Sequence, residues 1–504
     1  MKRFSIISIF LATILAAAAQ TSTSTNSTAP RAMGLQDCIQ QALSHNFDVQ
    51  VQRLNPQIAL YTLNGAYGGY DPTLNASGQH LFNDSGADFA GAVPIPGTSY
   101  DQNSFNSSLG GSTPWGLSYN FAGNISDTYN YNLPPALLTN SENSGGSIGV
   151  TLTQPLLKNF WIDNTRLTIR VAKNRLKYSE QGLRQQLITT VNAVENAYYE
   201  LIYAQESVGV QTQALQLAQT QLDQDRQRVQ IGTVAERDGT IEQDEAQVAQ
   251  SQANLISAVS TLGTDQRLLK NLITDEYSKW FAADIHPTMT LEAQQQTFNL
   301  QESWRKGMNE RPDLLQARLN VEQQGIQLKF YQNQVFPELD LIGSYGFNGT
   351  GQQYSDTLSQ FNEGNRPFYT YGAQLSMPLS NVGPRNQVKS GKITLKQLLL
   401  EMKQLEQNVM VEIDNAVDVA KSDYEGVNAS RQARIYAEAA LDAEQKKYAV
   451  GKSTTFTVLQ LQNNLTADRA AEIRALANYN EALANLALEE GSTLERNNID
   501  LKAK

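Results

Sequence analysis

The longest pattern in the chain is helical, with apolar residues recurring at spacings of three and four. It runs through a proline-free stretch from Leu156 to His286, and an internal proline would cost a helix about 3 kcal/mol. Such spacing is typical of a coiled-coil seam. A helix from about Asn164 to Gln230 would be roughly 100 Å long at 1.5 Å per residue, longer than a compact domain is wide. The seam residues are Leu187, Val191, Val194, Tyr198, Leu201, Val208, Leu215, Ala218, Leu222 and Val229.

The second half of the chain repeats this pattern in a run that has no proline from Arg385 onward. A glycine interrupts each run, Gly232 in "RVQIGTVAERD" and Gly451 in "KYAVGKSTTF", 219 residues apart. Glycine suits a tight turn because it reaches positive φ without steric cost. We therefore expect one long antiparallel helical hairpin in each half. The second seam begins with Leu398, Met402, Leu405 and Val409.

Between the helical runs the pattern changes to alternation of apolar and polar residues. Alternation is typical of strands with one apolar and one wet face, as in a membrane barrel. An ordinary half-buried antiparallel sheet produces the same pattern, so both interpretations remain open at this point. The alternating positions are Leu339, Leu341, Gly343, Tyr345 and Phe347, then Tyr369, Tyr371, Ala373, Leu375 and Met377, and in the first half Ile148, Val150 and Leu152.

The order of short helix, strands and long helical run occurs twice, which predicts an internal duplication. The stretch "LQDCIQQALSHNF" aligns with "LQESWRKGMNERP" 265 residues later, and Pro72 and Pro337 keep that offset. Further along, Pro155 and Pro378 are 223 residues apart. The first half therefore has about 42 more residues than the second between these landmarks.

The duplication also limits the number of strands. Two strands per copy give about four per chain, and barrels begin at about eight strands. Because open sheet edges are not tolerated in lipid, strands that cross a membrane require the chain to oligomerise. We expect the excess of the first half in a long exposed loop from Gln79 to about Gly146, in which "LGGSTPWGLSYNFAGNIS" is compatible with an added hairpin.

Composition agrees with an elongated protein that leaves the cytoplasm. The 504 residues have a mean hydropathy of −0.41 and 8% aromatic residues, which is lean for packed cores. Lys2 and Arg3 precede an apolar run that ends at Ala19, which predicts a cleaved secretory signal. The net charge of −11 argues against nucleic-acid binding. The single Cys38 excludes an internal disulfide framework and is expected to be buried.

The chain shows no arrangement of residues that indicates catalysis. His45, His80 and His286 lie far apart and lack the spacing of a metal or acid-base site, so we expect neither an enzyme nor a bound cofactor or metal. Acidic residues are frequent on the helices. They include Glu242, Asp244 and Glu245, which form either a solvated face or part of the lining of a water-filled tunnel.

These features together resemble the TolC-type outer-membrane efflux protein family, the outer-membrane factors of tripartite efflux and type I secretion systems. The resemblance covers the chain from Leu35 to about Gly491. It rests on the duplicated opening, on "TQPLLKNF" and "SMPLSNVGPR" where strand passes to long helix, and on the two glycine breaks. It implies a mainly α fold with a transmembrane β part, in which long antiparallel hairpins form an α-barrel and four strands per protomer form a 12-stranded trimeric β-barrel.

The resemblance places the functional residues at the two hairpin tips. Tyr448 and Asp238 match family positions that hold the tip closed, Ser453 stands where a basic partner is expected, and Thr457 and Gln460 stand where some members have rings of aspartate. We therefore hypothesise a periplasmic gate whose closure relies less on charge. The tip residues implied to dock a periplasmic adaptor are Ile231, Gly232, Thr233, Val450, Gly451 and Lys452.

The function implied by the resemblance is passive conduction. A homotrimer in the outer membrane of a Gram-negative bacterium, extending into the periplasm, would carry substrates from an inner-membrane transporter of the RND, ABC or MFS type, joined through a periplasmic adaptor (membrane fusion) protein. Its other partner would be outer-membrane lipid, and nucleic acid is not expected. The alternative is a secreted coiled-coil scaffold, which would share the seam and the signal.

The expected division of the chain follows from the repeat. It has residues 1–19 as signal peptide, 20–34 as Ser/Thr-rich linker, 35–70 as first short helix, 71–155 as first strands with the long extracellular loop, 156–272 as first long hairpin, 273–299 as equatorial linker, 300–335 as second short helix, 336–380 as second strands, 381–490 as second long hairpin and 491–504 as C-terminal tail.

Overall fold

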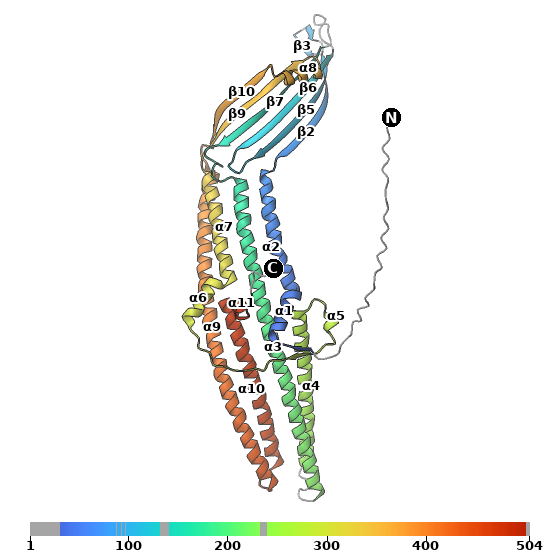
Figure 1. Cartoon of the computed structure of the whole chain (residues 1–504), viewed down its shortest axis with the longest axis vertical. Coiled ribbons are helices and arrows are strands. Elements are labelled where there is room, and N and C mark those ends of the chain that lie inside the picture. The colour runs from blue at the N-terminus through green and yellow to red at the C-terminus, as the bar shows by residue number, and fades with distance from the viewer. Residues whose placement is uncertain are drawn as a thin grey trace, which may run out of the picture.

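The computed structural model shows an elongated molecule with a sheet at one end and two helical hairpin tips at the other (Figure 1). It describes residues 31–86, 88–91, 93–95, 97–131, 141–231 and 239–499. The predicted signal peptide, most of the linker after it and the end of the C-terminal tail lie outside the described residues. No helix in the described part of the chain is both long enough and apolar enough to cross a bilayer.

The first repeat begins with two helices instead of one continuous short helix. The helices α1 (Leu35–His45) and α2 (Phe47–Ala66) are separated at Asn46, whose side chain accepts hydrogen bonds from the backbone N–H groups of Asp48 and Val49. This side-chain cap satisfies backbone donors at the start of α2 and ends α1. A short 3₁₀ helix, η1 (Tyr67–Tyr70), then leads into the sheet.

The predicted long hairpins are confirmed. In the first repeat α3 (Asn164–Gln230) spans 67 residues and packs along α4 (Thr240–Ile273). In the second repeat α9 (Val382–Ala449) spans 68 residues and packs along α10 (Thr455–Glu490). The remaining helices are α5 (Tyr277–Trp280), α6 (Leu300–Glu310), α7 (Pro312–Gln334), α8 (Tyr354–Glu363) and α11 (Thr493–Arg496).

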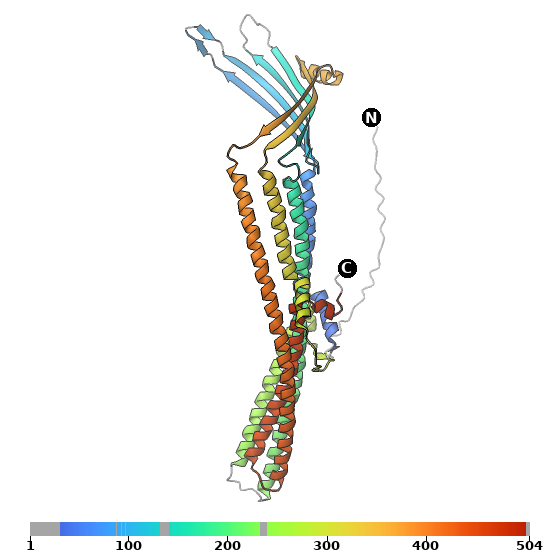
Figure 2. The ribbon, with the colours of Figure 1, turned by 90° about the vertical axis from the view of Figure 1, so that its left-hand side faces the viewer.

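Among the described residues, one sheet holds six strands in the order β10-β9-β7-β6-β5-β2, which corrects the expected four per chain. All neighbours are antiparallel, and Figure 2 shows the sheet curving away from the helices. These strands are β2 (Thr73–Ser85), β5 (Thr98–Ser112), β6 (Ser118–Tyr131), β7 (Ser141–Pro155), β9 (Glu338–Gly351) and β10 (Pro367–Ser376). Two small separate sheets pair β3 (Asp88–Ala90) with β4 (Val93–Ile95) and β1 (Arg31–Met33) with β8 (Ile285–Pro287).

Strands β5 and β6 account for the difference, because they lie inside the segment that we expected to be a long loop. The hairpin that "LGGSTPWGLSYNFAGNIS" allowed is present, and it is longer than expected and belongs to the main sheet. Their apolar positions are sparse, with Phe105 and Leu109 on β5 and Phe121 and Ile125 on β6, among many Ser, Asn and Gly residues. Such composition is typical of loops when a segment is considered alone. Pairing with β2 on one side and β7 on the other satisfies the backbone groups and makes both segments strands.

The register of the sheet separates apolar from polar side chains. Leu109 pairs with Leu74 and Phe121, Phe121 with Val150, and Val150 with Tyr345. Successive side chains on a strand point to opposite faces, so these positions form a continuous apolar band on one face. The opposite face carries small and polar residues, including Asn75, Ser77, Asn106, Ser108, Asn120, Asn124, Ser147, Thr151, Ser344, Thr370 and Gln374.

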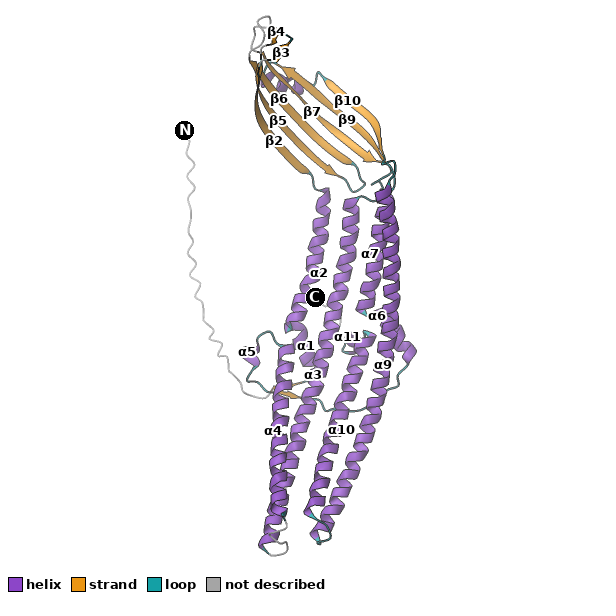
Figure 3. Ribbon diagram, turned by 180° about the vertical axis from the view of Figure 1, so that it is seen from behind, coloured by secondary structure: helices purple, strands orange, loops and turns teal. Residues whose placement is uncertain are grey.

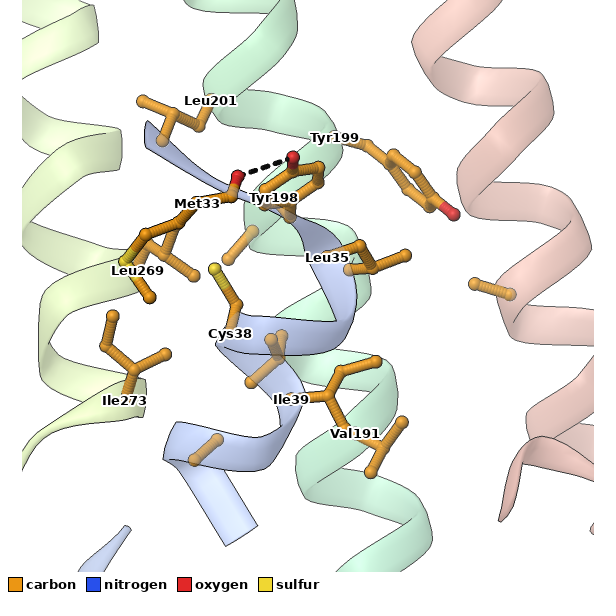
Figure 4. Close-up of a cluster of buried hydrophobic side chains, with 14 of the residues drawn as sticks. Met33, Leu35, Cys38, Ile39, Val191, Tyr198, Tyr199, Leu201, Leu269 and Ile273 are labelled. Atoms are coloured by element: carbon orange, nitrogen blue, oxygen red, sulfur yellow. Dashed lines mark hydrogen bonds between the residues drawn. The ribbon is translucent and has the colours of Figure 1, made fainter. Parts of the chain in front are cut away.

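The packed core lies halfway along the molecule, where α1 fits between α3 and α4 (Figures 3 and 4). The predicted seam residues Val191, Val194, Tyr198 and Leu201 are buried there, and Cys38 is fully buried, as expected. The Tyr198 hydroxyl donates a hydrogen bond of 3.0 Å to the carbonyl oxygen of Met33, which fixes the chain that precedes α1.

A charged junction holds the second repeat together at the same level. The guanidinium group of Arg311, before α7, contacts Asp313 at 2.8 Å, Glu412 on α9 at 2.6 Å and Glu489 on α10 at 2.7 Å. Only 13% of the Arg311 side chain is exposed, so water screens these pairs less than it screens surface pairs.

Candidate functional site: the hairpin tips

The first tip joins α3 to α4. Ile231 follows the last residue of α3 and is 74% exposed. Gly232, Thr233 and Asp238 lie outside the described residues, so their predicted roles remain predictions. The described chain resumes at Gly239, which has φ 66° and precedes α4.

The second tip is described throughout. Gly451 has φ 72°, a conformation that favours glycine, and its N–H donates to the carbonyl oxygen of Tyr448 at 3.0 Å. The N–H of Lys452 donates to the carbonyl oxygen of Lys447 at 2.9 Å, and this hydrogen bond caps the C-terminus of α9. Val450 and Lys452 are exposed at this turn. The predicted turn is thus present, whereas the adaptor contact expected of it stays a prediction.

Tyr448 connects the two hairpins. Its hydroxyl donates a hydrogen bond of 2.7 Å to a carboxylate oxygen of Asp225 on α3, 223 residues earlier in the chain. The hydroxyl also lies 2.6 Å from the hydroxyl of Thr455 at the start of α10. The guanidinium group of Arg228 lies 4.2 Å from the centre of the Tyr448 ring, within cation–π range. Burial raises the pKa of Tyr448, which keeps its hydroxyl a donor.

The described hydrogen bonds of the predicted gate residues Ser453 and Thr457 stay within the second hairpin. The Ser453 hydroxyl donates to Glu444 on its own hairpin at 2.6 Å. The Thr457 hydroxyl lies 3.0 Å from that of Thr454, within the first turn of α10, and Gln460 is exposed.

Asp225 is the centre of the contact between the hairpins, and it was not among the predicted site residues. It is fully buried. Besides Tyr448, it accepts hydrogen bonds from the Thr455 hydroxyl at 3.2 Å and from the Gln221 amide at 2.8 Å, and it pairs with Arg228 at 3.5 Å. A carboxylate held by several donors fixes their geometry strongly, because hydrogen bonds to charged groups exceed neutral ones in strength.

A second carboxylate, Asp244 on α4, is also fully buried. Within the described residues, no hydrogen-bond donor reaches either of its oxygens. Burial, and next the charge of Asp225, raise the pKa of Asp244 from its ordinary 3.8 to about 7. The tip therefore contains a carboxyl group that gains or loses its proton near neutral pH. Asp244 is therefore not part of a solvated face, because it is buried within the chain. Glu242 and Glu245 are exposed, so for them both a solvated face and a tunnel lining remain open.

A signal for Asp225 was present in the seam. Seam positions continue at spacings of three and four, and Asp225 lies three residues after Leu222 and four before Val229. A charged residue at a seam position is buried by the partner helix and usually serves a specific contact. The spacing therefore singles out Asp225 even without the structure.

Two solved structures of outer-membrane proteins share this architecture. The Campylobacter jejuni CmeC outer membrane channel superposes with a TM-score of 0.65 at 14% identity, over 93% of this chain and 90% of that one. The Vibrio cholerae outer membrane protein VceC gives a TM-score of 0.65 at 17% identity, over 91% and 96%. At these identities the likeness shows the fold, and it confirms the predicted mainly α class with long helical hairpins and a β part, whereas the expected four strands per chain are six in the described sheet.

The chain belongs to the outer membrane efflux protein family, whose model matches residues 38–274 and 306–491. This confirms the predicted family and its outer-membrane localisation. The outer membrane protein TolC of Escherichia coli (strain K12) is 25% identical over 306 residues, which cover 60% of each chain and so less than two thirds of that relative. TolC of Vibrio cholerae is 23% identical over 394 residues, 75% of this chain and 84% of that one. These relatives are channel-family proteins, which supports a role other than catalysis.

Proposed function

We propose that the chain forms a trimeric conduit that carries substrates from an inner-membrane transporter and a periplasmic adaptor through the outer membrane, without an energy source of its own. The observation that carries the proposal is the apolar band on one face of the six-stranded sheet. The chain passes from this sheet directly into the two long hairpins. A membrane barrel needs an apolar outer face and a wet inner face. A secreted coiled-coil scaffold would expose such an apolar band to water, which is unfavourable.

Exposed apolar residues support the closure of a ring. They follow both lateral edges of the molecule, one formed by α2 and the other by α9 (Figures 1 and 3). Exposed apolar side chains repeated along a helix support an interface, and contact between opposite edges of successive copies generates a ring. The residues on α2 are Phe47, Val51, Leu54, Ile58 and Tyr61, and those on α9 include Ile393, Leu400, Val411 and Val419.

The tips support the expected contact with an adaptor. Ile231 and Val450 are 74% and 69% exposed at the two turns, where a partner can bury them. Above the turns, a cavity of about 640 Å³ lies between the two hairpins. It is lined mostly by polar side chains, including Gln213, Gln216, Thr220, Glu438, Gln445 and Arg469.

The test is planar-bilayer conductance of the detergent-purified protein, with the oligomeric mass measured on the same sample. We expect a trimer with discrete openings of low conductance, because the hydrogen bonds of Asp225 hold the tips of each chain together. A soluble oligomer without activity in the bilayer would overturn the proposal.

A further inference from the structure

The sheet differs from a four-stranded arrangement by one inserted hairpin. The repeat pairs the start of β2 with that of β9, at Pro72 and Pro337, and the end of β7 with that of β10, near Pro155 and Pro378. In the second repeat β9 pairs directly with β10. In the first, β5 and β6 lie between β2 and β7, so this hairpin is the extra part of the first repeat.

The inserted hairpin belongs fully to the wall of the sheet. β5 pairs with β2 along the whole length of β2, from Thr73 to Ser85, and β6 pairs with β7 from Ser118 to Asn130. The side chains of Phe105 and Ile125 continue the apolar band, and Asn124 on the other face accepts a hydrogen bond of 2.6 Å from the Ser147 hydroxyl. Neither strand lies above or inside the sheet as a plug would.

Among the described strands, β2 and β10 at the two ends of the sheet each have a neighbour on one side only. Unpaired backbone groups are not tolerated in the hydrocarbon region, so both edges need partners there. β2 runs away from the helices and β10 returns towards them (Figure 1), so β10 of one copy is antiparallel to β2 of the next.

We propose that three copies close a barrel of eighteen strands, six from each chain, through pairing of β2 with β10 of a second copy of this chain. This inference rests on the trimer of the proposed function. It also sets the width of the outer end of the conduit, since barrel diameter grows with strand number and barrels of 16–18 strands enclose an aqueous channel.

Disulfide cross-linking within the full-length protein tests the insertion. Ser77, Asn106, Asn124 and Ser147 form one row across β2, β5, β6 and β7. We expect S77C/N106C and N124C/S147C to form disulfides on oxidation, detected by peptide mass. The matched control S77C/S147C separates its cysteines by three strand spacings, about 14 Å, which is too far for a disulfide. A disulfide in S77C/S147C would place β2 beside β7 and overturn the inference.

Cryo-electron microscopy of the unmodified protein in lipid nanodiscs counts the strands directly. A trimer with eighteen wall strands supports the inference, and a trimer with twelve overturns it while leaving the proposed conduit intact. A monomer, or a particle without a membrane-embedded barrel, would instead defeat the proposed function. The two failures are therefore distinguishable.

Discussion

The two hairpin tips belong to the two copies of one repeated unit, yet their equivalent carboxylates have different partners. At the 219-residue offset of the turns, Asp225 on α3 corresponds to Glu444 on α9. Asp225 accepts hydrogen bonds from Tyr448 and Thr455 of the other hairpin. Glu444 accepts from Lys447 at 2.8 Å and from Ser453 at 2.6 Å, both within its own hairpin.

The positions around these carboxylates explain the difference. Tyr448, the donor to Asp225, corresponds to Val229 in the first repeat, which has no hydroxyl group to offer Glu444. Asp244 corresponds to Asn463, whose amide exchanges hydrogen bonds with Gln247 on α4. At Asp225 the first repeat thus supplies the acceptor and the second repeat the donors. A few substitutions after the duplication suffice to make similar tips complementary.

The largest effect is expected when Asp225, the acceptor between the two tips, is removed. Asp225→Ala eliminates both hydrogen bonds that Asp225 accepts from the other hairpin, each worth at least about 1.5 kcal/mol, so we expect single-channel open probability to rise about 100-fold. Two control variants should change the open probability less than about twofold. They are Glu444→Ala, at the equivalent position on α9, and Asp223→Ala, at an exposed position on α3. Equal effects of Asp225→Ala and Glu444→Ala would contradict the assignment.

The second prediction concerns pH. Because the pKa of Asp244 is raised to about 7, the closed tip is stabilised by its protonated form, and that contribution is lost as the pH rises through 7. We expect the open probability to rise about tenfold between pH 5.5 and pH 8, as the ionised group repels Asp225. Asp244→Asn should remove this rise. Glu242→Gln, at an exposed position of the same helix, should retain it, and a flat wild-type profile would refute the prediction.

An effect smaller than that of Asp225→Ala is expected for Tyr448→Phe. The variant loses the hydrogen bond to Asp225 but keeps the ring that stacks against Arg228. The loss of one of the two hydrogen bonds that Asp225 accepts from the other hairpin, worth about 1.5 kcal/mol, should raise the open probability about tenfold. Tyr436→Phe on the same helix, where the side chain is 70% exposed, is the control. An unchanged open probability in Tyr448→Phe would leave Thr455 as the essential donor.

The smallest expected effect is on ion selectivity. Thr457→Asp and Gln460→Asp place carboxylates beside the second tip, and each should raise the cation preference in reversal-potential measurements about twofold. Gln460→Asn is the neutral control. If Thr457→Asp leaves selectivity unchanged, Thr457 does not line the pore. The ion pair of Asp225 with Arg228 is a charged contact at the closed tip, so it argues against the hypothesis that closure relies less on charge.

The long elements could be predicted from the sequence because their pattern repeats over many residues. The seam from Leu187 to Leu222 and the absence of proline specify α3 closely. The sequence allowed a hairpin at "LGGSTPWGLSYNFAGNIS" but did not place it in the main sheet, because β5 and β6 carry few apolar residues. Of the predicted gate residues, Tyr448 reaches the first hairpin, whereas Asp225 required attention to a charged residue in the seam.

The sequence by itself determined the duplication, the two hairpins with their turns and the alternating faces of the strands it identified, because each depends on local spacing and on backbone preferences of proline and glycine. Only the tertiary structure decided that residues 98–131 complete a six-stranded sheet and that Asp225 and Asp244 are buried together. Strand pairing and burial depend on neighbours distant in the chain, such as Tyr448, 223 residues beyond Asp225. No local pattern records which distant segment will supply them.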